Sequence, residues 1–294
     1  MQRSLGSTGI MVNPIGLGGM PMSIVGRPDA TQSHGVIHAA IDGGMDFIDT
    51  ADVYCMNHED IGHNERLIAE ALTQHPRGGE VVVATKGGLE RPNGQWTRNG
   101  HPDHLTSACE ASLKALRTDC ITLYQLHAPD PEVPFAESMG ALQRLQEAGK
   151  IAHVGLSNVS VEQIQEAQSL VEVVSVQNRC NIIDRSAFSD GVVAYCEAQQ
   201  IAFLPYCPVG GRGQKEALGS HPLLTEIASR FDVSPQQVAL AWLLKQSPVM
   251  IPIPGASKVT NAISSAQAQN LALGLGALME LNQAFPTEPS DTGR

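Results

Sequence analysis

The sequence predicts a (β/α)8 barrel of the TIM type, which is an α/β fold. Short apolar runs typical of buried strands alternate with longer amphipathic segments, and this alternation predicts parallel βαβ units. The chain has 294 residues and one such barrel needs roughly 250, so we expect residues 1–294 to form a single domain. The strand-like runs are Asn13–Gly18, Asp46–Thr50, Val81–Lys86, Ile121–His127, Ala152–Ser157, Val173–Asn178, Ala202–Tyr206 and Val249–Pro254.

Helical periodicity follows each strand-like run. Ser160 and Gln163 form the pattern of a capping box at the start of one such segment. A hairpin over Arg3–Val12 should precede the first strand, and Leu271–Phe285 is expected to add a C-terminal helix. The other expected helices are Thr31–Gly43, Asn64–Gln74, Pro102–Leu116, Phe135–Ala148, Ser160–Leu170, Ser186–Ala198, Pro222–Arg230, Ser234–Lys245 and Lys258–Ala268.

An open, doubly wound sheet is the alternative architecture. It requires a G-x-G-x-x-G turn between its first strand and the following helix. The glycines at the end of the first strand-like run, Gly16, Gly18 and Gly19, lack that spacing. The barrel is therefore favoured.

Composition and charge narrow the classes of partner. The formal net charge of −11 argues against nucleic acid or an anionic membrane as a general partner. The longest apolar runs fall far short of the roughly 20 residues that cross a bilayer, and the N-terminus has no apolar signal core. Six cysteines without CxxC spacing indicate reduced thiols. These features predict a cytoplasmic protein, and the oligomeric state is left open.

Polar residues at the carboxyl ends of barrel strands are candidates for an active site, because the βα loops build the site in this fold. Asp49, Lys86 and His127 end three of the predicted strands, and Tyr54 lies in the loop above the second. A buried lysine needs a carboxylate to compensate its charge, and Asp49 on the neighbouring strand is the natural partner. A purely structural ion pair at the barrel rim is the alternative for these two residues alone.

Tyr54 and His127 favour a catalytic interpretation of the same group. A nearby ammonium lowers the pKa of a phenol, so we expect Tyr54 to donate a proton near neutral pH. His127 would orient a substrate oxygen or pass on the proton. A hydrogen-bonded structural histidine is the alternative for that residue taken alone.

Eight motifs, in order along nearly the whole chain, resemble the aldo-keto reductase family. Individually each match is modest, but their order makes coincidence very improbable. They are Gly44–Tyr54 (GMDFIDTADVY), Asn64–Leu72 (NERLIAEAL), Ala84–Gly88 (ATKGG), Tyr124–His127 (YQLH), Val154–Asn158 (VGLSN), Val176–Asn178 (VQN), Pro205–Pro208 (PYCP) and Ile251–Ser257 (IPIPGAS).

The resemblance implies NADPH, or less often NADH, bound across the barrel mouth, and a small aldehyde or ketone as substrate. It makes Asp49, Tyr54, Lys86 and His127 the catalytic tetrad, with Tyr54 as the proton donor. Hydride would pass from the nicotinamide to the carbonyl carbon. Positions that match the family's contacts to the nicotinamide are Ser157, Asn158, Gln177 and Tyr206; a helix cap and a core aromatic are the alternatives for Ser157-Asn158 and Tyr206.

Two segments are expected to hold the phosphates. The glycine-rich stretch after Cys207 should bring backbone amides to the pyrophosphate, with Arg212 available for charge, unless it is only a surface loop. After the eighth strand, a helix N-terminus would favour an anion, and Lys258 is placed for a 2′-phosphate. The candidates are Cys207, Pro208, Val209, Gly211, Arg212, Gly255, Ala256, Ser257 and Lys258.

The chain departs from the family's pattern at three places. Ile263, Ser264 and Ser265 stand where an arginine and Glu-Asn are usual, which weakens the preference for NADPH over NADH. Cys207 replaces a common serine. A longer loop, Cys55–His63, follows Tyr54 and should shape the substrate pocket. Its cysteine and histidines match no familiar zinc spacing, so no metal site is expected.

A second hypothesis comes from a different class of protein. Channel-associated β subunits resemble this family and use the same barrel for regulation, with the cofactor as a redox sensor. All four tetrad residues are present here, and a protein that only binds has no need of the acid. The enzyme is therefore favoured. Trp96, within a predicted loop over Glu90–His101, is either a substrate contact or a packing anchor.

Overall fold

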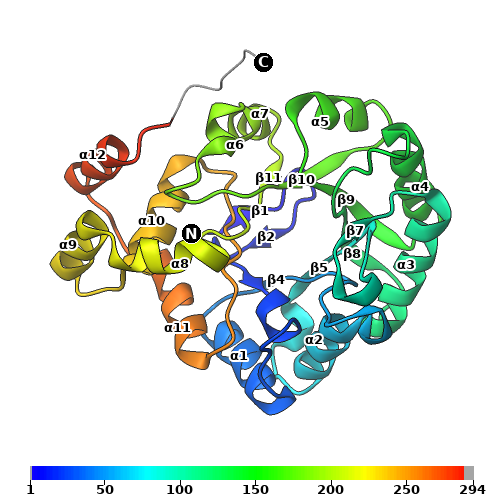
Figure 1. Ribbon diagram of the computed structural model, residues 1–294, viewed down its shortest axis with the longest axis horizontal. Helices are drawn as coiled ribbons and strands as arrows, with labels where there is room; N and C mark the ends of the chain where they lie inside the picture. Colours follow the sequence, from blue (N-terminus) through cyan, green and yellow to red (C-terminus); the bar gives the residue numbers. More distant parts are fainter. Residues whose placement is uncertain (1, 288–294) are drawn as a thin grey trace.

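A curled sheet of seven parallel strands forms the centre of the computed structural model, viewed along its axis in Figure 1. The structure describes residues 2–287, apart from the side chains of residues 212 and 213. The strand order is β11-β10-β9-β8-β5-β4-β3, and every neighbouring pair is parallel. These strands are β3 (Leu17–Gly18), β4 (Phe47–Asp49), β5 (Val82–Gly87), β8 (Ile121–Leu126), β9 (Ile151–Ser157), β10 (Val173–Gln177) and β11 (Ala202–Phe203).

The predicted eighth strand, Val249–Pro254, closes the barrel without forming a regular strand. Its backbone is hydrogen-bonded on both sides: Phe203 N donates to Val249 O at 2.8 Å, and Gly18 N donates to Pro254 O at 3.0 Å. Pro252 and Pro254 have no N–H, so they cannot donate to a ladder. The barrel prediction is confirmed, and the prolines explain why this segment makes only isolated bridges.

Helices surround the sheet in chain order (Figure 1). Capping boxes begin two of them, with Ser160 and Gln163 at α5 as predicted and Ser234 and Gln237 at α10. Their inward faces form apolar clusters against the outside of the strands. The surrounding helices are α1 (Ala30–Asp42), α2 (His63–Thr73), α3 (Pro102–Leu116), α4 (Phe135–Glu147), α5 (Val161–Gln168), α7 (Val192–Ala198), α10 (Pro235–Gln246) and α11 (Val259–Gln267).

Two predicted helices differ from those observed by a break or by more than two residues. The segment Ser186–Ala198 is two helices, α6 (Ser186–Ser189) and α7, because Gly191 adopts a left-handed φ of 82° between them. The C-terminal helix α12 (Leu275–Ala284) begins four residues later than predicted, since extended backbone at Leu271 and Gly274 precedes it. The other predicted helices agree with the observed ones to within two residues at each end, as in helix α9 (Pro222–Phe231), which ends one residue later than predicted.

The glycine-rich stretch after Cys207 was predicted to bring backbone amides to a pyrophosphate, with a surface loop as the alternative, and no helix was predicted there. Gly210 has a left-handed φ of 94° and caps helix α8 (Gly211–Ser220). Residues 214–218, with the sequence QKEAL, are good helix formers, which outweighs the two glycines of the first turn. Arg212, predicted to contact the cofactor, has a side chain that lies outside the described part of the structure.

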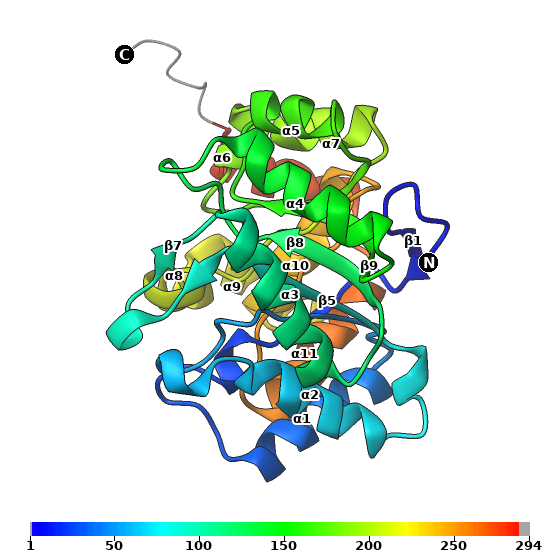
Figure 2. The ribbon, with the colours of Figure 1, turned by 90° about the vertical axis from the view of Figure 1, so that its right-hand side faces the viewer.

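The two ends of the barrel are different (Figure 2). The predicted hairpin, β1 (Arg3–Ser4) and β2 (Met11–Val12), lies at one end, and Leu5 and Val12 pack into the barrel interior there. Helix α8 and a second hairpin, β6 (Leu89–Glu90) and β7 (Thr97–Arg98), lie at the opposite end. That hairpin occupies the segment predicted as a loop over the mouth. Across residues 2–287, no helix is long and apolar enough to span a membrane.

Candidate active site

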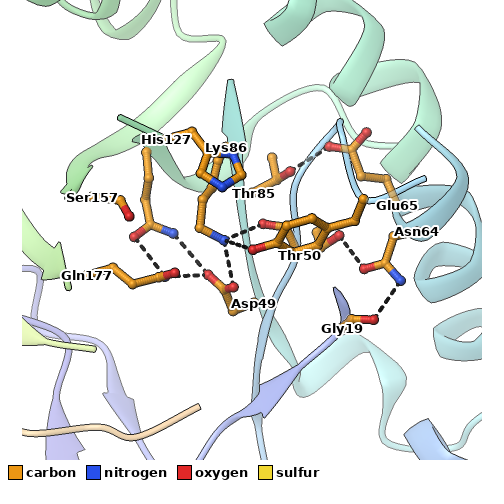
Figure 3. A network of polar contacts seen from close by, with 12 residues as sticks. Gly19, Asp49, Thr50, Asn64, Glu65, Thr85, Lys86, His127, Ser157 and Gln177 are labelled. Atoms are coloured by element: carbon orange, nitrogen blue, oxygen red, sulfur yellow. Dashed lines mark hydrogen bonds and ion pairs between the residues drawn. The ribbon is translucent and has the colours of Figure 1, made fainter. Parts of the chain in front are cut away.

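Lys86 and Asp49 form a buried ion pair inside the barrel. They lie on adjacent strands β5 and β4, and Lys86 Nζ is 2.6 Å from Asp49 Oδ2 (Figure 3). The same nitrogen donates to the carbonyl oxygen of Thr50 at 2.8 Å. Burial lowers the pKa of Lys86, and the carboxylate of Asp49 opposes that shift. The sequence prediction that Asp49 is the partner of Lys86 is confirmed by this contact.

Asp49 is held on its other oxygen by two amides. Gln177 Nε2 donates to Asp49 Oδ1 at 2.7 Å, and Gln125 Nε2 donates to the same atom at 3.1 Å. Gln125 was missed in the sequence. The available signal was strand periodicity, because Gln125 lies two residues before His127 on β8 and therefore faces the same side.

Polar contacts with helix α2 fix the backbone on either side of the ion pair. Thr50 Oγ1 donates to Asn64 Oδ1 on helix α2 at 2.6 Å, and Asn64 Nδ2 donates to the carbonyl of Gly19 at 3.0 Å (Figure 3). The adjacent residue of α2, Glu65, accepts from Thr85 Oγ1 at 2.6 Å. Asn64 and Glu65 belong to a motif that was recognised in the sequence, but their contacts were not foreseen.

Tyr54 reaches the ion pair from the loop after β4. Its phenol oxygen accepts a hydrogen bond from Lys86 Nζ at 3.1 Å. Burial, followed by the charge of Asp49, raises the pKa of Tyr54 well above its usual value of 10. The expectation of a lowered pKa was therefore wrong, because it counted the charge of the ammonium but not the loss of water around the phenol. The phenol is fully protonated at neutral pH.

His127 faces Tyr54 across the same end of the barrel. The ring centroids are 5.7 Å apart and the ring planes meet at 81°. Burial, and then the charge of Lys86, lowers the pKa of His127 well below 6.5, so the imidazole is neutral at pH 7. Its Nδ1 atom has no hydrogen-bond partner in the part of the chain that the structure describes.

Side chains that are suited to a carboxamide line the wall beside Asp49. Asn158 Nδ2 donates to Ser157 Oγ at 3.0 Å and to the backbone carbonyl of His127 at 2.9 Å. Tyr206 OH donates to Asn158 Oδ1 at 2.9 Å. Asn158 has a left-handed φ of 58°, a conformation that asparagine tolerates better than most residues. The structure thus brings together Ser157, Asn158, Gln177 and Tyr206, which the sequence had placed on three different strand ends.

An open cleft of about 860 Å³ lies above these residues. Asp49, Tyr54 and His127 line the cleft, while Lys86 is fully buried behind them. Ala256 is buried in the core beside α11, and Lys258 lies at the N-cap of that helix, so neither lines the cleft. The predicted cofactor residues that do line it are Ser157, Asn158, Gln177, Tyr206, Cys207, Pro208, Val209, Gly211, Gly255 and Ser257.

Cys207 makes a sharp turn at the edge of the cleft. Its φ of 51° is left-handed, and a Cβ atom placed on Gly211 would come within 2.5 Å of its sulfur. A glycine at position 211 therefore lets helix α8 start against this turn. Burial raises the pKa of the Cys207 thiol, so the thiol is protonated at neutral pH.

The loop Cys55–His63 is tied to the segment that follows the first strand. Arg27 pairs with Asp60 at 2.5 Å, and His63 Nδ1 lies 2.8 Å from Ser23 Oγ. The thiol of Cys55 instead contacts the carbonyl oxygen of Asn57 at 3.1 Å. These contacts give the loop a fixed conformation beside Tyr54. The described residues include no group of three possible metal ligands.

Comparison with known proteins places this site in a family. The model of the aldo/keto reductase family matches residues 14–274. An uncharacterized oxidoreductase of Schizosaccharomyces pombe is 35% identical over 285 residues, which cover 95% of this chain and 89% of the relative. The chain belongs to the aldo/keto reductase family. It is therefore an oxidoreductase, and the resemblance found in its motifs is confirmed.

Solved aldo-keto reductases share the fold of this family member. A thermostable aldo-keto reductase in complex with the inhibitor epalrestat has a TM-score of 0.81 and 27% identity, with 96% of this chain and 99% of that chain covered. An aldo/keto reductase from Klebsiella pneumoniae, solved in complex with NADP and acetate, has a TM-score of 0.80 and 24% identity, with 99% of this chain and 97% of that chain covered. Such scores over whole chains support the (β/α)8 barrel.

Proposed function

We propose that this aldo/keto reductase reduces an aldehyde or ketone to the alcohol, with NADPH as the hydride donor and Tyr54 as the proton donor. The observation that carries the proposal is the position of Lys86 Nζ, which contacts Asp49 Oδ2 at 2.6 Å and the Tyr54 oxygen at 3.1 Å. The phenol opens onto the cleft and the ammonium lies behind it. A proton donor is thus held at the floor of a ligand-sized cavity.

The residues around the cleft fit a nicotinamide dinucleotide. Ser157, Asn158 and Gln177 offer donors and acceptors for the carboxamide, and the ring of Tyr206 supplies a flat face beside them. The N-terminal amides of α8 and α11 are suited to phosphates. In support, the Klebsiella pneumoniae enzyme was solved with NADP. NADH is an alternative, because Ile263 provides no charge for a 2′-phosphate.

Bound NADPH supplies the hydride for the carbonyl carbon. Tyr54 then gives its proton to the oxygen, which is favourable because an alkoxide is a stronger base than a phenolate. The ammonium of Lys86 stabilises the phenolate that is left, in a site where water is excluded and electrostatic interactions are strong. Asp49 keeps that ammonium charged and in place. The neutral His127 can donate a hydrogen bond to the same carbonyl oxygen from the opposite side.

Turnover with simple carbonyl compounds tests the proposal. Loss of NADPH absorbance is followed with a panel of aldehydes and ketones, and the alcohol product is identified. Binding of NADPH is measured separately by quenching of protein fluorescence. Binding and alcohol formation are expected together. Tight binding with no turnover of any carbonyl compound would instead support the regulatory, channel β-subunit-like function.

A further inference from the structure

Arg91 is a buried cation beside the site. It follows strand β6, only 3% of it is exposed, and its Nη2 donates to the carbonyl oxygens of Cys55 and Met56 at 3.1 and 3.2 Å. Both carbonyls belong to the loop that begins at the residue after Tyr54. Arg91 therefore fastens the β6–β7 hairpin to the backbone that carries the proposed proton donor.

Trp96, near the tip of the same hairpin, lies flat against Arg91. The guanidinium carbon is 3.9 Å from the centroid of the indole ring, a cation–π contact. The residue is 46% exposed, so little apolar packing restrains it. The guanidinium is itself fixed by two carbonyls, and it can hold the indole in one orientation.

Three aromatic rings meet where a carbonyl substrate would bind. The Trp96 ring is 6.3 Å from that of Tyr54 and 6.5 Å from that of His127, with interplanar angles of 72° and 70°. Tyr54 and His127 are themselves nearly perpendicular, at 81°. The planes of the three rings are therefore nearly perpendicular to one another. A carbonyl compound bound with its oxygen at Tyr54 and His127 would therefore have the Trp96 ring beside it.

We propose that Arg91 is a positioning residue that fixes Trp96 as a wall of the substrate pocket, and that this wall selects carbonyl compounds with a flat, uncharged, aromatic substituent. The proposal rests on the function proposed above and adds its substrate class. Stacking against an indole favours aromatic over saturated rings of equal size. Two apolar residues that line the cleft, Met20 and Leu89, pack against the cluster that contains Tyr54.

The charge of Arg91 suggests a competing role, recognition of an anionic substituent. Its Nε and Nη1 atoms have no hydrogen-bond partner among the described residues. However, Arg91 does not line the cleft, whereas Trp96 does. The indole therefore stands between the cation and the substrate, which favours the positioning role.

Matched substrates separate these roles. The values of kcat/KM are measured for benzaldehyde and cyclohexanecarbaldehyde, which have rings of equal size, and for 4-carboxybenzaldehyde. The ratio of benzaldehyde to cyclohexanecarbaldehyde is compared between variant and wild type, because intrinsic reactivity then cancels. Trp96→Leu is expected to lower this ratio about 5- to 10-fold, and Trp96→Phe to keep it within about 2-fold. An equal loss for both aldehydes in Trp96→Leu would overturn the proposed selectivity.

Arg91→Lys keeps the charge and removes the planar fork. We expect it to lower the same ratio at least about 3-fold, while Arg98→Lys, an exposed arginine in the same hairpin, leaves it unchanged. Melting temperatures of both variants show whether they fold. Arg91→Met removes the charge, and a fall confined to 4-carboxybenzaldehyde in that variant would identify an anion site instead and contradict the positioning role.

A measurement without turnover keeps this inference separate from the proposed function. The chain has two tryptophans, and Trp242 is fully buried, so acrylamide quenching reports chiefly on Trp96. Arg91→Lys is expected to raise the quenching constant about 2-fold because the indole is released, and Arg98→Lys is expected to leave it unchanged. If quenching does not change in Arg91→Lys, Arg91 does not hold Trp96. If quenching rises but no aldehyde is reduced, the proposed function fails and the substrate selectivity falls with it.

Discussion

Lys86 Nζ lies 2.6 Å from Asp49 Oδ2, and the two side chains are only 0% and 3% exposed. A charge so far from water is stable only with its partner. Asp49→Asn is therefore expected to lower the free energy of unfolding by about 3 kcal/mol, and the double variant with Lys86→Met by less than the sum of the single effects. Urea denaturation measures both. Additive effects would show that the two side chains are not coupled.

The pH dependence of stability should carry a contribution from His127. Burial lowers its pKa in the folded protein well below 6.5, while the unfolded chain takes up a proton near that value. The contribution of His127 to the free energy of unfolding is therefore fully present above about pH 6.5. It is lost as the pH falls below that value, at up to about 1.4 kcal/mol per pH unit. In His127→Gln, the free energy of unfolding should therefore fall less steeply with decreasing pH, and the slope should be smaller by this contribution. Identical slopes in the two proteins would contradict a neutral, buried imidazole.

Cofactor preference should respond to the exposed face of α11. Ile263 is 40% exposed on this helix, and Lys258 lies at its N-cap. An arginine at position 263 adds a charge for a 2′-phosphate, so Ile263→Arg is expected to tighten NADPH binding about 10-fold and to leave NADH unchanged. Lys258→Met should weaken NADPH binding and leave NADH binding unchanged. Fluorescence titration with both cofactors measures these changes, and equal effects on NADPH and NADH would place the phosphate elsewhere.

Most of the fold could be predicted from local patterns. Alternating apolar strands and amphipathic helices gave the barrel, and Asp49, Lys86 and His127 were found because strand ends meet at one mouth in this fold. The predicted elements were wrong where proline or glycine changed the local backbone. Pro252 and Pro254 prevent a regular eighth strand. Helix α8 was not predicted because it begins in a glycine-rich segment, next to Gly210.

Contacts between distant residues could not be predicted from the sequence. Gln177 binds Asp49 although 128 residues separate them, and no local pattern encodes that pairing. The pKa of Tyr54 was misjudged for a similar reason, since it depends on burial by several segments rather than on the neighbouring ammonium alone. The stacking of Arg91 on Trp96 likewise requires the hairpin to be folded against the Cys55–His63 loop.

The role of Tyr54 as the proton donor is the central claim, and single-turnover reduction of an aldehyde by bound NADPH tests it most directly. Tyr54→Phe is compared with Tyr195→Phe, a control in which the lost hydroxyl bonds to Gln168 on the outside of the barrel. We expect Tyr54→Phe to slow the chemical step by about 10²- to 10⁴-fold with unchanged NADPH affinity, and Tyr195→Phe to match the wild type. Full-rate reduction by Tyr54→Phe would contradict the mechanism.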